Sequence, residues 1–114
     1  FINAKTYIGI VDAVIAGEGS GPGEPDPVKM NYLISGINPV AIDCVCAKLM
    51  GFDFNKIPSL KNAFDIKHLK LVDFDYEMID VINDFKEKVN IKNIQESYIK
   101  KCKPHFGWEK HIEL

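Results

Sequence analysis

Three carboxylates beside a glycine-rich loop are the groups in this sequence best suited to chemistry. Asp12 lies toward the end of a predicted strand, Glu18 lies in the loop that follows, and Asp43 lies in the second turn of a predicted helix. Carboxylate oxygens are the ligands that hard divalent cations prefer. Because α/β folds bind ligands outside the carboxyl ends of their strands, we expect the three acids to converge there on a divalent cation or a small polar ligand, with Gly19 and Gly21 shaping the loop.

Each of these groups also has a purely structural interpretation. Gly19 and Gly21 can supply the positive φ angles that a turn requires. Asp43 lies in an otherwise apolar helix, where an unpaired buried carboxylate is costly, so it must reach solvent, a neighbouring loop or a ligand. The loop spacing is neither G-x-G-x-x-G nor that of a P-loop, and its acids would repel phosphate, which argues against a phosphate site.

The cysteines and histidines do not form a metal-binding pattern. Cys44 and Cys46 lie about 200° apart around a regular helix, so we predict that both pack as small apolar side chains. With Cys102 they make an odd number without a C-x-x-C pair, which is typical of a reducing, cytoplasmic setting. The three histidines lack ligand spacing too. We therefore expect no iron–sulfur cluster in this segment and a divalent cation as the one candidate metal.

The elements that must position the acids begin with two strands and a loop. Residues 7–15 form an almost continuous β-branched apolar run, which predicts a strand buried on both faces. Residues 17–27 contain four glycines and three prolines, which predicts a loop. Residues 28–35 begin with alternating apolar and polar side chains and predict a second strand.

A buried helix is expected over residues 39–50. Asn38 is a favourable N-cap, and Pro39 suits the first helical position. Gly51 is placed to end the helix in a left-handed conformation. Because only two residues between positions 40 and 50 are polar, most of the circumference of this helix should be buried.

The remaining residues give weaker patterns. We predict a short helix over residues 58–64, a strand over 69–74, a helix over 78–85 and a short amphipathic helix over 93–101. The aromatic segment 104–114 is expected to pack back on the body of the protein. The sequence thus predicts an α/β or α+β fold, with a small mixed sheet and a buried central helix, as a single domain or as part of a larger one.

Composition limits the classes of function. The 114 residues carry 14 lysines, no arginine and a formal net charge of −2, so the broad positive surface of a nucleic-acid-binding protein is absent. The apolar runs are far shorter than the roughly 20 residues needed to cross a membrane. Because residue 1 is Phe and a strand-like run begins almost at once, we expect the chain to be cut from a longer one.

The segment Asp12-Ala13-Val14-Ile15-Ala16-Gly17-Glu18-Gly19-Ser20-Gly21-Pro22, followed by Asn38-Pro39-Val40-Ala41-Ile42-Asp43, resembles the C-terminal part of the bacterial and archaeal family called domain of unknown function 362. The resemblance is specific over residues 7–58. It differs at Asn38, where the family usually has Asp, and at Cys44 and Cys46, where small residues are usual. It implies a partner in the rest of the parent chain or in a ferredoxin-like module that binds iron–sulfur clusters.

Two classes of function follow. In the first, the segment contributes an acidic glycine-loop pocket, formed by Asp12, Glu18 and Asp43, to an enzyme or a redox-associated protein. In the second, it is a non-catalytic structural or protein-interaction domain, and its carboxylates lie apart with hydrogen bonds to backbone groups. Reaction, substrate and oligomeric state do not follow from the sequence.

Overall fold

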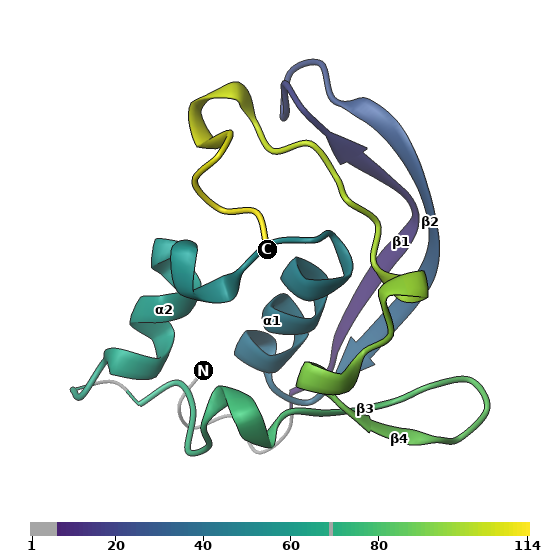
Figure 1. Ribbon diagram of the computed structural model, residues 1–114. Coiled ribbons are helices and arrows are strands. Elements are labelled where there is room, and N and C mark those ends of the chain that lie inside the picture. The colour runs from purple at the N-terminus through teal and green to yellow at the C-terminus, as the bar shows by residue number, and fades with distance from the viewer. Residues whose placement is uncertain (1–6, 69) are drawn as a thin grey trace.

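The computed structural model describes residues 7–68 and 70–114, which form two β-hairpins and two α-helices (Figure 1). The mixed α/β class is confirmed, although each sheet is a two-stranded antiparallel hairpin rather than part of one mixed sheet. The elements are β1 (Gly9–Glu18), β2 (Asp26–Gly36), α1 (Pro39–Leu49), α2 (Pro58–Asp65), β3 (Asp80–Ile82) and β4 (Lys88–Asn90).

The long β1–β2 hairpin confirms both strands predicted in the first third of the chain. Its strands extend further into the glycine-rich segment than predicted, since β1 continues to Glu18 and β2 starts at Asp26. The register shifts between Ala13 and Ile15, where two β2 residues lie opposite Val14 alone. One of these, Asn31, has a φ of 61°, a left-handed conformation that Asn tolerates better than most residues.

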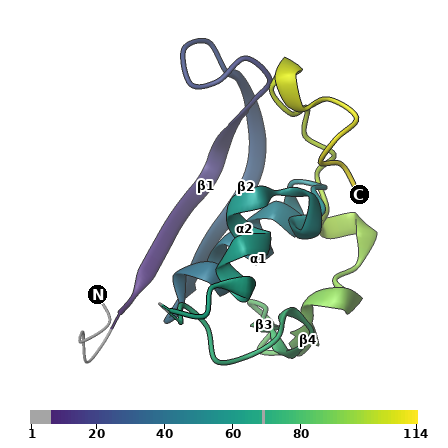
Figure 2. The ribbon, with the colours of Figure 1, turned by 90° about the vertical axis from the view of Figure 1, so that its left-hand side faces the viewer.

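Helix α1 packs against one face of the hairpin, and a pair of glycines lets it approach closely. Gly9 and Gly36 are partners in the ladder, and a Cβ atom built on either would lie less than 3 Å from the Ile42 side chain. A larger residue at either position would push α1 away from the sheet. Figure 2 shows the hairpin as one layer, with α1 and α2 on the same side of it.

The predicted ends of α1 are confirmed by its capping bonds. The Asn38 Oδ1 accepts a hydrogen bond from the Ala41 amide at 3.1 Å, and Pro39 is the first helical residue. At the other end Gly51 has a φ of 81°, its amide donates to the Lys48 carbonyl at 3.0 Å, and the Phe52 amide donates to the Ala47 carbonyl at 2.8 Å. These bonds form a Schellman motif, which satisfies carbonyls that a helix end leaves without partners.

Amides from distant residues bind the carbonyls of the last residue of α1 and of the two residues that follow it. The Leu49 carbonyl accepts from the Lys100 amide at 2.7 Å, the Met50 carbonyl from Cys102 at 3.0 Å, and the Gly51 carbonyl from Leu114 at 3.0 Å. Phe52 and Glu113 also form an isolated β-bridge. The turn after α1 therefore ties two later parts of the chain to the centre of the molecule.

Three predictions for the second half of the chain are wrong. Residues 70–74 form no strand, and Leu69 lies outside the described residues. Residues 78–85 form strand β3 and a turn rather than a helix, because the Asn83 side chain and backbone bind the amides of Glu87 and Lys86. Residues 93–101 form no α-helix but contain the 3₁₀ turn Glu96–Tyr98 and the last residue of another, Ile91–Asn93, since so short a segment is a marginal helix without strong packing. The short helix predicted over residues 58–64 is confirmed by α2.

The buried core is centred on α1, where Cys44 is buried as predicted, whereas Cys46, for which the same packing is predicted, is only partly buried. Next to it, Phe54 stacks on Tyr76 with ring centroids 3.8 Å apart and meets Phe64 edge to face at 5.7 Å. The C-terminal segment returns to the core through Ile112 rather than through its aromatic residues, because Phe106 is exposed and Trp108 is partly exposed. None of the helices in residues 7–68 and 70–114 has the length and apolar character to span a membrane.

Candidate interaction surface

The Asp12 carboxylate lies on the exposed face of β1 and binds its own strand. Its Oδ1 accepts a hydrogen bond from the Val14 amide at 3.1 Å. Its ladder partner on β2 is Leu33, which offers no charge to pair with it. Asp12 is therefore a negative group between the exposed apolar side chains of β1, opposite a β2 face on which Lys29, Asn31 and Ser35 are also exposed.

The Glu18 carboxylate points instead to the C-terminal segment. Its Oε2 accepts from the Lys103 amide at 2.7 Å, and the neighbouring Gly19 amide donates to the Lys103 carbonyl at 2.9 Å. Gly19 has a φ of 72°, and its carbonyl accepts from the Gly21 amide at 2.8 Å. Glu18, Gly19 and Gly21 thus shape the tip of the hairpin and hold the C-terminal segment to it.

Asp43 lies on the exposed side of α1. Partial burial of the Asp43 carboxyl raises its pKa. Burial, together with the charge of Asp43, also raises the pKa of the Cys44 thiol to about 12. The fully buried Cys44 therefore remains a protonated, unreactive thiol, as its predicted packing role requires.

Metal binding by these acids has no geometric support in the described residues. Across residues 7–68 and 70–114, no three side chains of His, Cys, Asp or Glu come together in a way that could hold a metal ion. The two acids with hydrogen bonds to backbone groups, Asp12 and Glu18, already serve the hairpin and its neighbouring segment. The acidic site thus remains a prediction from sequence.

The most distinctive surface of the molecule is the face of the hairpin turned away from α1. Ile10 is 69% exposed, Ile15 67% and Leu33 74%. Val14 lies beside them and is also exposed. We call Ile10, Val14, Ile15 and Leu33 the outer face. The prediction that the first strand is buried on both faces is wrong for the described residues, because none of their helices covers this side (Figure 2).

The β1 strand also has an open edge. In the described part of the chain it pairs with β2 and with no third strand. Strands at a sheet edge usually carry lysine or proline, which discourage pairing with another chain. β2 carries both, as Pro27 and Lys29, whereas β1 carries neither. The sequence signal for this surface was the apolar character of β1 at both alternating sets of positions.

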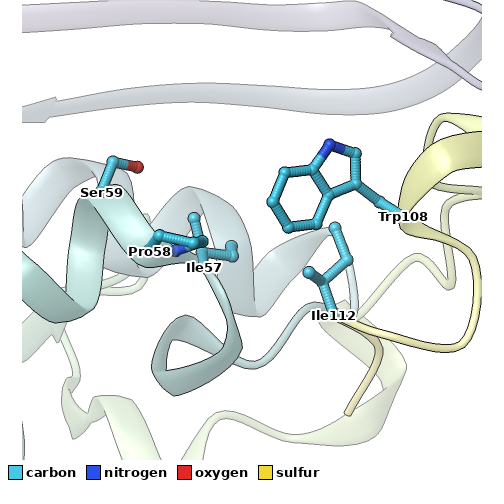
Figure 3. Close-up of a pocket in the computed structure, with 5 residues that line it drawn as sticks. All are labelled: Ile57, Pro58, Ser59, Trp108 and Ile112. Atoms are coloured by element: carbon cyan, nitrogen blue, oxygen red, sulfur yellow. The ribbon is translucent and has the colours of Figure 1, made fainter.

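A second apolar feature is an open groove of about 470 Å³ between the start of α2 and the C-terminal segment. Figure 3 shows Trp108 and Ile112 facing Ile57 and Pro58, with Ser59 at the rim. The lining offers a single hydroxyl and no acid or base. This groove can accept an apolar side chain, but it does not present the groups of an acid–base catalyst.

Comparison with known protein families finds similarity in the part of the chain that contains the β1–β2 hairpin. Residues 1–48 match the family described as Domain of unknown function (DUF362). This region includes the β1–β2 hairpin and most of α1, and the match supports the resemblance seen in the sequence. No curated protein and no solved structure is significantly similar to the chain.

Proposed function

We propose that this chain is a protein-interaction domain, whose outer face and β1 edge are covered by another polypeptide segment. The observation that carries the proposal is the exposure of Ile10, Ile15 and Leu33 on one face of a strand pair. Large apolar side chains exposed together on one strand pair are a feature of interaction sites in soluble proteins. A strand that is apolar on both sides is also typical of the interior of a larger α/β sheet.

We propose the rest of the parent chain, or a ferredoxin-like module, as the covering segment. The resemblance to a family in which some members carry such modules supports this choice. In this proposal any iron–sulfur cluster belongs to the partner, and the hairpin is the surface to which that partner binds.

Site-specific photo-crosslinking tests the interaction. A photoreactive amino acid replaces Leu33 in the parent protein, and the crosslinked product is mapped by mass spectrometry. We expect crosslinks to one defined segment, and we expect Ile10→Ser to reduce their yield. The matched control places the same group at Phe85, which is exposed in the turn between β3 and β4. Equal, scattered crosslinking from both positions would contradict the proposal.

A further inference from the structure

We infer that β1 is a docking strand for a basic partner strand, which pairs along the edge opposite β2 and places a lysine or arginine beside Asp12. This inference rests on the proposed interaction function and specifies how the partner binds. It follows from the open edge, the distribution of charge over the hairpin and the position of Asp12.

The open edge determines the mode of binding. β1 is ten residues long, and a strand edge presents unpaired amide and carbonyl groups that an extended peptide can bind. Proline and lysine, two residues that discourage such pairing, lie on β2 as Pro27 and Lys29 and are absent from β1. One donor of β1, the Val14 amide at the irregularity of the ladder, is bound by the Asp12 side chain and is not available to a partner strand.

The charge determines the chemistry of the partner. Residues 9–36 contain four carboxylates, on Asp12, Glu18, Glu24 and Asp26, and one basic residue, Lys29. Two such hairpins would repel each other, so a second copy of this chain is disfavoured as the occupant. A strand with a positive side chain is complementary to this surface.

Asp12 marks the position at which that charge belongs. Its ladder partner on β2 is the apolar Leu33. Asp12 takes part in none of the salt bridges of the described residues. A strand added to β1 would place its own side chains on the outer face, one of them next to Asp12. A basic residue there forms the cross-strand ion pair that β2 does not supply, while the apolar residues two positions away on either side lie beside Ile10 and Val14.

Strand peptides provide the test. The probes are two fluorescent ten-residue peptides of alternating valine and threonine, with either lysine or glutamate at one central valine position, so that the flanking side chains on the same face are valines. Binding to the whole chain is measured by fluorescence anisotropy, and hydrogen exchange locates the amides that become protected. We expect the lysine peptide to bind about two- to fivefold more tightly, the effect of one cross-strand charge pair, and to protect β1 amides but not β2 amides.

Charge reversal on the protein supplies the control. Asp12→Lys should invert the preference between the peptides, whereas Glu24→Lys, which makes the same charge change in the exposed loop, should preserve it. Equal binding of both peptides, or protection of β2, would overturn the inference. If the β1 amides become more protected from exchange as the protein concentration rises in the absence of peptide, the edge pairs with a second copy of this chain instead. If the peptides fail while Leu33 still crosslinks to one segment, the interaction function stands and strand addition does not.

Discussion

Replacing Gly51 with alanine tests the packing of the turn that ends α1. Gly51 has a φ of 81°, and a Cβ atom there would lie 3.2 Å from the Lys101 Cα and 3.3 Å from the Lys100 carbonyl oxygen. A left-handed conformation costs an L-residue about 1–2 kcal/mol. The close neighbours are backbone atoms, which cannot rotate away as a side chain would. We therefore expect Gly51→Ala to lower the free energy of unfolding by about 2 kcal/mol or more.

Urea unfolding, followed by far-UV circular dichroism, measures this loss, which should appear as a lower midpoint at an unchanged slope. In a thermal scan we expect Tm to fall by roughly 8 °C, at about 4 °C per kcal/mol for a domain of this size. The matched control is Gly23→Ala, since a Cβ at Gly23 meets no atom within 4 Å; it should stay within about 0.5 kcal/mol of wild type. If the two variants were equally stable, the tight contact between the turn and residues 100–101 would be refuted.

Four further outcomes are expected. Glu18→Ala should destabilise the protein by about 1–2 kcal/mol in urea unfolding because it leaves the Lys103 amide without its acceptor, and Glu18→Gln should retain most of that stability. Cys44 should resist alkylation by iodoacetamide at pH 8 in the native state, because burial raises the pKa of its thiol to about 12; rapid modification before unfolding would contradict this. Asp43→Asn should raise stability at pH 7, because burial raises the pKa of the folded carboxyl and disfavours its charged form; this gain should shrink as the pH falls through the folded pKa and vanish below the unfolded pKa of about 3.9. Calorimetric titration with Mg²⁺, Mn²⁺ and Ca²⁺ should show no saturable heat, and binding that is lost in Asp43→Asn would restore the acidic metal site.

The sequence predicts the first half of the fold well because its signals are local. Asn38, Pro39 and Gly51 mark the ends of α1 through their own backbone preferences, and the structure shows the corresponding hydrogen bonds. The helix predicted over residues 78–85 is wrong although its signals are local too, because those signals conflict. Its apolar spacing suited both periods, and the turn chemistry of Asn83, with Lys86 at a φ of 63°, decided in favour of a hairpin.

The candidate site was harder to predict because it depends on contacts between distant residues. No local pattern reveals that Glu18 binds an amide 85 residues later in the chain. The apolar run of β1 is evident in the sequence, but the spacing of its residues cannot show which segment covers each side of the strand. Exposure of Ile10 and Leu33 depends on which other elements lie over the hairpin, and that is a property of the tertiary structure.

The turn after α1 also sets the order in which the protein can fold during synthesis. The carbonyls of Leu49, Met50 and Gly51 are bound by amides about 50 to 60 residues later in the chain. While the ribosome is still translating those later codons, α1 and the hairpin can form, but the end of α1 faces water. These three carbonyls therefore stay without their amide partners in the nascent chain until residues 100–114 have been synthesised.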